Sequence, residues 1–225
     1  MRVVSLVPSV TETLLAWGIT PVACTRFCEQ PLLAHVGGTK DPDIEAIVAL
    51  SPDLVVVDEE ENRRDDAEAL RSRGIGLHVM AIRSLHDVPT QTATLAGAVG
   101  VPVEPVVIES KWFTLPKPRV FVPIWKRPLM TINADTYGSS ALTWIGADNV
   151  FGTTSRRYPE VTMTEVVAAK PDIVLLPSEP YPFAERHRNE FAVTGADVRL
   201  VDGRDLFWWG ARTPGALDRL WKALR

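Results

Sequence analysis

The stretch VALSPDLVVVDEE, Val48–Glu60, occurs a second time in slightly changed form as VAAKPDIVLLPSE, Val167–Glu179. Each copy has a short helical pattern, then a Pro-Asp pair (52–53 and 171–172), then a run of aliphatic residues with a polar end. The residue before a proline avoids the α region, so each helix should end there. A continuous aliphatic run is typical of a parallel strand that is buried on both faces. The sequence therefore predicts the same helix–strand–loop unit twice.

Strand and helix patterns alternate around the first copy. The aliphatic run Arg2–Val7 predicts a buried strand, and Ser9 followed by Glu12 predicts a capping box for a helix that ends at Gly18. The further strands expected in this half are 21–25, 54–58 and 75–80, and the further helices are 44–50 and 62–73.

The second half repeats this order. The expected strands are 119–124, 172–176 and 198–201, and the expected helices are 137–145, 164–169, one near 183–191 and 214–224. Strands separated by helices imply parallel sheets with right-handed crossovers. We therefore predict an α/β protein with two Rossmann-like lobes, residues 1–100 and 119–225. They are joined by a linker, 101–118, whose four prolines suit the ends of a helix over Glu104–Leu115.

Composition narrows the function classes. The chain has 225 residues, 46% of them hydrophobic, and a formal net charge of −4, so it offers no basic footprint for nucleic acid. No run approaches the roughly 20 apolar residues of a membrane span. Met1 and Arg2 lead directly into a strand without an export signal. The expected location is therefore cytoplasmic as given, or periplasmic or extracellular if a signal had been removed.

In open parallel sheets, ligands bind beyond the carboxyl ends of the strands. Two such lobes facing one another would form a cleft, and the loops at strand ends are rich in aromatic, polar and cationic residues, as suits a sizeable amphipathic small molecule. The loops expected at this site are 8–11, 26–31, 37–40, 58–62, 125–128, 133–137, 178–183 and 207–212.

The sequence FWWGAR, Phe207–Arg212, places three aromatic rings in a row between a strand and a helix. We expect at least one ring to face solvent or a ligand, because an ordinary core would not accommodate all three. An indole could stack on a planar macrocycle while Arg212 meets an anionic group. The alternative is that Trp208 and Trp209 both fill the interface between the lobes.

Two further groups lie at strand ends in the second half. Trp125, Lys126 and Arg127 follow its opening strand and offer an indole beside two cations, although both cations could simply be solvated. Tyr181, together with Phe183, forms the third aromatic group.

The sequence lacks the phosphate-binding, dinucleotide-binding and nucleophile-elbow motifs, and no serine has a paired histidine and carboxylate. We therefore predict a non-enzyme with no catalytic residues, no metal site and no intrinsic cofactor. Two alternatives remain open. One is a cytoplasmic enzyme that uses the acidic run Asp58–Glu61, which would otherwise be a solvated edge. The other is binding of a bare metal ion through His35, Cys24, Cys28 and acidic residues.

The segments RVVSLVPSVTETLLAWGITPVACT, residues 2–25, and IEAIVALSPDLVVVDEE, residues 44–60, with the units of the second half, resemble the helical-backbone type of periplasmic solute-binding protein. This class III family contains the vitamin B12, ferric-siderophore and haem receptors of ABC importers. The resemblance implies a metal chelate (cobalamin, haem or a ferric siderophore) held as ligand between two lobes that one long helix joins. The contact positions that it implies are Pro8, Ser9, Arg26, Phe27, Cys28, Gly38, Thr39, Trp125, Lys126, Arg127, Tyr181, Trp208 and Trp209.

Three departures from the family make an ABC importer a doubtful partner. No export signal is visible, and a linker helix of about 12 residues would span only ~18 Å. Family members dock through a surface carboxylate on each lobe, but Arg64 stands where the first is expected, while Glu185 could serve as the second. The sequence therefore favours a cytoplasmic relative that binds or buffers a cobalamin-like or iron-chelate ligand over a transporter subunit.

Overall fold

The computed structural model describes residues 1–102, 106–108 and 117–225, which form two compact units. The linker helix expected over 104–115 lies mostly outside the described residues, and the part described, 106–108, is not helical. Unit 1 comprises Met1–Ile82, His86–Val106 and Trp209–Arg212, and unit 2 comprises Arg83–Leu85, Val107–Trp208 and Thr213–Arg225.

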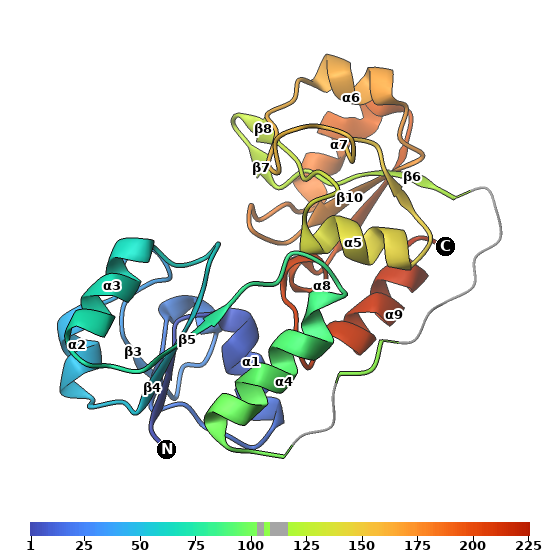
Figure 1. The fold of residues 1–225 in the computed structure, drawn as a ribbon. Coiled ribbons are helices and arrows are strands. Elements are labelled where there is room, and N and C mark those ends of the chain that lie inside the picture. Colours follow the sequence, from blue (N-terminus) through green and yellow to red (C-terminus); the bar gives the residue numbers. More distant parts are fainter. Residues whose placement is uncertain (103–105, 109–116) are drawn as a thin grey trace. The chain divides into compact units, whose positions relative to one another are not determined.

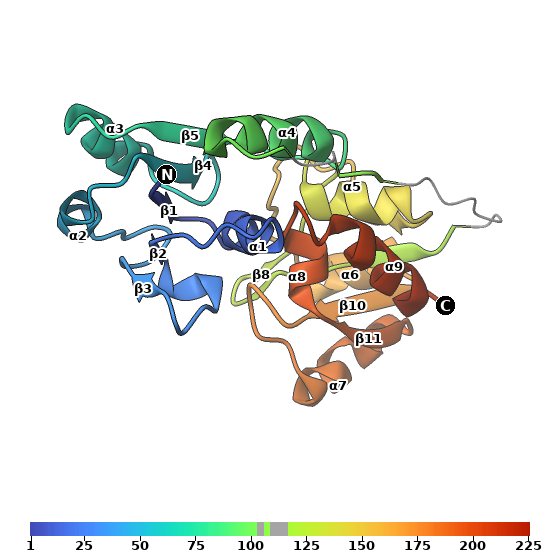
Figure 2. The same ribbon diagram turned by 90° about the horizontal axis from the view of Figure 1, so that it is seen from below.

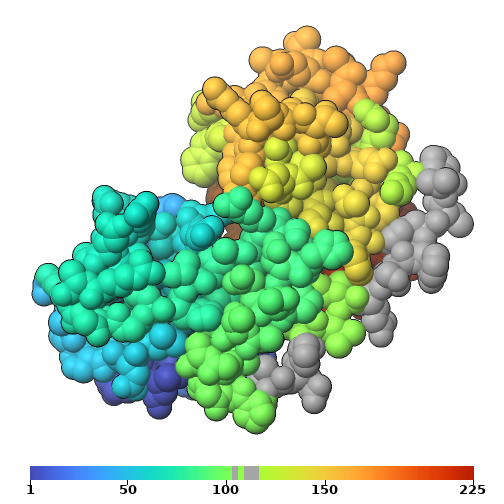
Figure 3. All heavy atoms as spheres, viewed as in Figure 1, coloured from blue at the N-terminus to red at the C-terminus, as the bar shows by residue number. Residues whose placement is uncertain are grey.

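Unit 1 contains a five-stranded parallel sheet with the order β3-β2-β1-β4-β5 (Figure 1). Its strands are β1 (Val3–Ser5), β2 (Ala23–Cys24), β3 (Ala34–His35), β4 (Leu54–Asp58) and β5 (Leu77–Met80). Its helices are α1 (Pro8–Ala16), the 3-10 helix η1 (Arg26–Cys28), α2 (Ile44–Ala49), α3 (Arg64–Ser72) and α4 (Asp87–Val99). Figure 2 shows α3 and α4 near β5, and both helices form much of the surface of this unit in Figure 3.

Unit 2 contains a four-stranded parallel sheet with the order β11-β10-β6-β9 and a separate antiparallel hairpin, β7-β8. Its strands are β6 (Arg119–Phe121), β7 (Trp125–Lys126), β8 (Leu129–Met130), β9 (Asp148–Asn149), β10 (Ile173–Pro177) and β11 (Asp197–Val201). Its helices are α5 (Tyr137–Trp144), α6 (Met163–Ala169), η2 (Glu185–His187), α7 (Arg188–Phe191), η3 (Ala192–Thr194), α8 (Gly203–Phe207) and α9 (Thr213–Ala223).

The two sheets share one strand order, because β2-β1-β4-β5 in unit 1 corresponds to β9-β6-β10-β11 in unit 2. The aliphatic runs of the repeated stretch form the inner strands β4 and β10, each paired on both sides. Residues 55–58 of β4 and all of β10 are buried, as expected of central parallel strands. The predicted α/β fold with parallel sheets is confirmed.

The repeated Pro-Asp pair fixes the opening strand of each sheet. The Asp53 carboxylate accepts the backbone N–H of Arg2 (2.5 Å), and the Asp172 carboxylate accepts that of Arg119 (2.7 Å). The backbone N–H groups of the two aspartates donate in return to the carbonyls of Arg2 (2.9 Å) and Arg119 (2.8 Å). The motif thus has the same structural role in both units, which is to hold the turn before β4 or β10 against the start of the opening strand.

The same arginines also cap the preceding helices. The Arg2 guanidinium donates to the carbonyl of Leu50 (2.8 Å), and the Arg119 guanidinium donates to that of Ala169 (2.8 Å). A cation at this end stabilises carbonyls that have no partner within the helix. The residues before the two prolines, Ser51 and Lys170, both have positive φ angles, +47° and +48°, so the two turns also share one backbone shape.

The predicted capping box at Ser9 and Glu12 is wrong. The N-cap of helix α1 is Val7, two residues before Ser9, and Pro8 is the first helical residue, so Ser9 lies inside the helix and is buried. Proline suits this position because its missing N–H would have no helical partner there. A capping box is present instead at α6, between Thr162 and Glu165.

The elements that the sequence did not predict are η1, β3, α4, the hairpin β7-β8, β9, η3 and α8. None of the described helices combines the length and the apolar character that crossing a membrane requires.

Candidate ligand site

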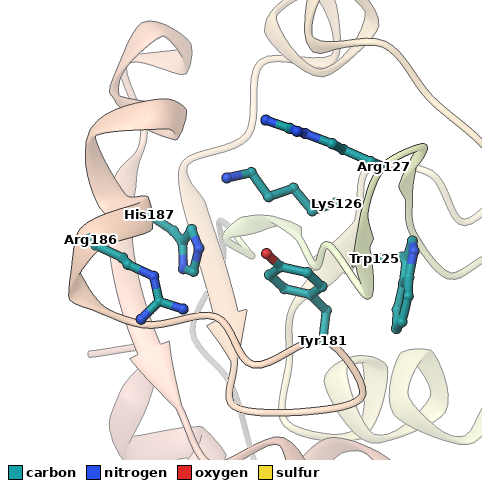
Figure 4. Close-up of a pocket in the computed structure, with 6 residues that line it drawn as sticks. All are labelled: Trp125, Lys126, Arg127, Tyr181, Arg186 and His187. Carbon is teal, nitrogen blue, oxygen red and sulfur yellow. The ribbon is translucent and has the colours of Figure 1, made fainter.

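A pocket of about 360 Å³ lies in unit 2, beyond the carboxyl ends of β6 and β10 (Figure 4). It brings together four of the residues that the sequence singled out and two that it did not. The lining residues are Trp125, Lys126, Arg127, Tyr181, Arg186 and His187.

The hairpin β7-β8 presents three of these side chains. After β6, the N–H of Ile124 donates to the carbonyl of Met130 (2.8 Å), and the chain folds back through a turn at Arg127. Trp125 is 44% exposed although it is a large apolar side chain. The indole and the two cations that follow it are thus held at a surface by a short, paired ribbon.

Aromatic rings form one wall of the pocket. The Tyr181 ring meets Trp125 edge to face, with 5.7 Å between ring centroids, and lies equally far from the ring of His187. It also packs on Phe183, at 4.7 Å, which belongs to the core of unit 2. Because it contacts rings on several sides, Tyr181 is positioned by packing, and its hydroxyl points into the space between Lys126 and His187 (Figure 4).

The lining contains three cations and no carboxylate. Lys126 forms an ion pair with Glu190 on α7 (2.6 Å), which holds its ammonium group beside the pocket. Arg127 and Arg186 form no ion pair with any other residue that the structure describes. Two guanidinium groups are therefore available for an anionic group, which guanidinium can bind through two parallel hydrogen bonds.

His187 is buried at the base of this pocket, and its Nδ1 accepts the backbone N–H of Ala184 (2.9 Å). Burial lowers the pKa of His187, and the positive charges of Arg186 and Lys126 lower it further. The neutral ring therefore carries its proton on Nε2, which makes it a hydrogen-bond donor and not a fourth cation.

In unit 1, four of the predicted residues meet beyond β2 and β3. The Arg26 guanidinium lies 4.8 Å from the centroid of the Phe27 ring and pairs with Asp41 at 3.1 Å. A side chain at Gly38 would collide with this pair, because its Cβ would lie 2.8 Å from Arg26 Nη2. Thr39 is tied in through its carbonyl, which accepts from the side chain of Asn62 (2.9 Å).

Asp58, in the acidic run behind the enzyme alternative, closes its own loop. It is buried and accepts the backbone N–H groups of Glu60 (2.8 Å) and Glu61 (3.2 Å). Burial raises the pKa of Asp58 to about 6, partly offset by these two hydrogen bonds. Its own N–H donates to the side chain of Asn62 (2.8 Å). Together these hydrogen bonds hold the loop 58–62 in one conformation.

The residues of the bare-metal alternative do not converge. Across the described part of the chain, no group of three or more His, Cys, Asp or Glu side chains could hold a metal ion. The ring of His35 is hydrogen-bonded to the carbonyl of Gln30 (3.0 Å) at the surface, whereas Cys24 and Cys28 are buried.

The predicted residues Ser9 and Arg212 lie in a different cluster, where Trp209–Arg212 packs on α1. The N–H of Trp209 donates to Ser9 Oγ (3.3 Å), and that of Ala211 donates to Thr13 Oγ1 (3.2 Å). The Arg212 guanidinium pairs with Glu12 at 2.6 Å. The side chains of the expected capping box therefore bind a segment about 200 positions away.

The sequence predicts that at least one ring of FWWGAR faces solvent or a ligand. Neither tryptophan faces solvent, and contact of a ring with a ligand stays a prediction. Trp208 and Trp209 are only 9% and 4% exposed, and Phe207 is half-buried. Pro8, at the start of α1, is also buried. The physical reason is that the backbone around Trp209 is hydrogen-bonded to the hydroxyl groups of α1, which draws the segment inward.

Arg186 and His187 were missed because no motif marks them. Both follow the aromatic stretch around Tyr181 closely in the sequence, and that proximity was the available signal. Their side chains reach the pocket only because η2 turns back toward the hairpin.

Comparisons with known proteins support this picture. Residues 3–105 match the family described as periplasmic binding protein. A vitamin B12-binding protein of Vibrio parahaemolyticus is 25% identical over 190 residues, which cover 77% of this chain and 69% of the relative. These relatives are binding proteins, and they give no support to the enzyme or bare-metal alternative.

Solved structures show the same fold. The periplasmic haem-binding protein RhuT from Roseiflexus sp. RS-1 aligns with a TM-score of 0.80 at 19% identity, covering 99% of this chain and 97% of that one. The periplasmic vitamin B12-binding protein BtuF of Vibrio cholerae aligns with a TM-score of 0.76 at 19% identity, covering 99% and 96%. The predicted class III fold and the family resemblance are confirmed, and the doubt about an importer partner finds no support.

Proposed function

We propose that this chain, which has the fold and sequence pattern of the helical-backbone periplasmic binding proteins, is a solute-binding protein for a metal chelate of the cobalamin, haem or ferric-siderophore type. The observation that carries this proposal is the pocket of unit 2, where the indole of Trp125 and the phenol of Tyr181 stand beside three cations. Aromatic faces suit a flat or ring-bearing chelate, and guanidinium groups suit its acidic substituents.

The charges of the lining favour an anionic ligand. Arg127 and Arg186 have no ion partner among the described residues, and the ring of His187 adds a neutral donor. A tetrapyrrole with carboxylate arms, or a ferric tris-catecholate with net negative charge, would satisfy all three groups. A neutral chelate would leave two cations unpaired. We therefore rank haem-like and anionic ferric ligands ahead of cobalamin.

The predicted contacts Arg26 and Phe27 lie together in unit 1 and stay predictions. The remaining predicted contacts are Pro8, Ser9, Gly38, Thr39, Trp208, Trp209 and Arg212. They stay predictions, and their observed contacts and burial are those of structural residues.

The test is a direct titration. Purified ligand-free protein is titrated separately with hemin, cobalamin, a ferric tris-catecholate and a ferric tris-hydroxamate while tryptophan fluorescence is followed. We expect saturable quenching with the first and third, and a smaller quench in Trp125→Phe. Trp221→Phe serves as the matched control, because Trp221 stacks on Arg225 far along α9 and lines no part of this pocket. Saturable binding of none of the four would refute the ligand class.

A further inference from the structure

The three cations that line the pocket of unit 2 are not equivalent. Lys126 Nζ lies 2.6 Å from Glu190 Oε1, so its charge is compensated by a carboxylate that does not itself line the pocket. Arg127 and Arg186 form no ion pair with the other residues that the structure describes. Within the described part of the chain, the lining therefore has two uncompensated positive charges.

Glu190 is held beside the pocket by the core of unit 2. It lies on the short helix α7, and the ring of the next residue, Phe191, is 6.0 Å from that of Phe183 and 6.1 Å from that of Phe121. The carbonyl of Phe191 also accepts the hydroxyl of Thr194 (2.7 Å). Because Phe191 anchors α7, the backbone of Glu190 has a defined position.

The ion pair between Lys126 and Glu190 joins two elements and is partly shielded from water. Lys126 lies on β7, opposite Leu129 of the hairpin, and its side chain is 22% exposed, while that of Glu190 is 44% exposed. Partly buried charges are screened less by salt and water than fully exposed ones. The carboxylate of Glu190 therefore acts on any charge that a ligand brings next to Lys126.

The two uncompensated guanidinium groups come from different elements. Arg127 follows β7, and Arg186 belongs to η2. In Figure 4 the ammonium group of Lys126 lies between them. One carboxylate can be fully occupied by one guanidinium, through two parallel hydrogen bonds. A ligand that satisfies both arginines therefore needs two separate acidic groups.

The centre of the pocket is polar but adds no further charge. The hydroxyl of Tyr181 points into the space between Lys126 and His187 (Figure 4). The Nδ1 atom of His187 accepts the N–H of Ala184 (2.9 Å), so its ring is a neutral donor through Nε2. These groups suit uncharged oxygen atoms of a ligand. A third acidic group would meet no uncompensated cation among the lining residues.

We infer that the pocket of unit 2 selects ligands with two separate acidic groups, and that Glu190 sets this number by compensating Lys126. The inference rests on the proposed function and names the ligand class within it. A tetrapyrrole with two carboxylate arms fits the pocket, whereas a trianionic ferric tris-catecholate carries one negative charge too many. Glu190 is a specificity-determining residue that acts through Lys126.

The first measurement uses three ferric porphyrins that differ in their carboxylate arms: hemin with two, its monomethyl ester with one and ferric coproporphyrin with four. Absorbance titration of the wild-type protein gives their dissociation constants. Hemin should bind roughly tenfold or more tightly than the monomethyl ester, because the ester leaves one guanidinium group unpaired. The two extra arms of coproporphyrin should change the affinity by less than about threefold, as expected of charges that remain exposed.

The second measurement repeats the series with charge variants. Glu190→Gln should raise the affinity for coproporphyrin relative to hemin by about threefold or more, because Lys126 becomes a third uncompensated cation. Adding Lys126→Gln should restore the wild-type ratio, since two such cations remain. Glu68→Gln is the matched control, because it removes the same charge from an ion pair with Arg64 in unit 1. Its ratio should equal that of the wild type.

The inference is overturned if Glu190→Gln leaves this ratio unchanged, or if the double variant keeps the ratio of the single variant. An ion pair that merely tied the hairpin to α7 would give the first result. The wild-type series decides the number of acidic groups even if a variant does not fold. Equal affinities for hemin and its monomethyl ester, or binding of the ferric tris-catecholate without hemin, overturn that number and leave the proposed function standing. Binding of neither the porphyrins nor the tris-catecholate removes both.

Discussion

The carboxylate of Glu12 on the first helix holds the guanidinium of Arg212 at 2.6 Å, so a residue close to the end of the chain completes unit 1. The Arg212 side chain is only 12% exposed, and neighbouring backbone N–H groups donate to Ser9 and Thr13 on the same helix. The ion pair and these two hydrogen bonds thus form a small, mostly buried polar cluster, which we call the clasp.

Arg212→Gln should lower the free energy of unfolding by about 1–3 kcal/mol, because it leaves a partly buried carboxylate without its partner. Urea denaturation of Glu12→Gln, Arg212→Gln and the double variant measures the coupling between them. The control is Arg64→Gln, which breaks an ion pair with Glu68 on an 89% exposed side chain and should change stability by less than about 1 kcal/mol. Equal effects of Arg212→Gln and Arg64→Gln would show that the clasp adds no stability.

Gly210 permits the close approach of this segment to α1. Its φ is +101°, and a Cβ there would lie 2.1 Å from Thr13 Oγ1. Gly210→Ala should therefore destabilise the protein by about 1–3 kcal/mol or more. Gly97→Ala is the matched control, because Gly97 lies inside α4 with nothing within 4 Å of the added methyl group. That change should instead stabilise by about 0.5–1 kcal/mol. Melting curves of both variants check the opposite signs.

Arg186→Gln should weaken binding of the anionic ligand by roughly tenfold or more, because one charge-assisted hydrogen bond contributes about 1.5–3 kcal/mol. Binding of a neutral chelate should change far less. Isothermal titration of wild type, Arg186→Gln and the remote variant Arg64→Gln gives the comparison at equal net charge. Unchanged affinity in Arg186→Gln would place the anionic groups of the ligand elsewhere.

Asp58 should make stability depend on pH in an unusual direction. Its pKa is raised from 3.8 to about 6 in the folded protein, so the folded state binds more protons than the unfolded state between these values. Stability should therefore fall as pH rises from about 4 to 6, and the ionised form should cost about 3 kcal/mol above that range. Asp58→Asn keeps an acceptor for Glu60 and Glu61 and removes the charge. Urea denaturation at pH 4.5 and pH 8 measures the free energy of unfolding of both proteins. We expect the variant to be more stable than the wild type only at pH 8.

Strand β4 was predicted with its observed ends, Leu54–Asp58, because a proline before it and an unbroken aliphatic run are local signals. The two halves were likewise predicted from the repeated Pro-Asp pair. By contrast, Ser9 and Glu12 looked like a capping box because their true partners lie about 200 positions away. A pattern that short cannot distinguish a local hydrogen bond from a distant one.

The candidate site was predictable to the extent that it follows strand ends. Trp125 and Tyr181 were found because parallel strands bring their carboxyl ends to one edge, and the pocket lies there. Arg186 was missed because its place depends on how η2 packs, which no local pattern encodes. The burial of Trp209 could not be decided from the sequence, because it follows from backbone contacts with α1.

Because unit 1 includes Trp209–Arg212, it is not a continuous piece of the sequence. As the chain leaves the ribosome, the first sheet can assemble early, but Ser9, Glu12 and Thr13 wait for partners that lie about 200 positions further along the sequence. A fragment that ends at residue 102 would lack these partners permanently, so the amino-terminal half alone is an incomplete structural unit.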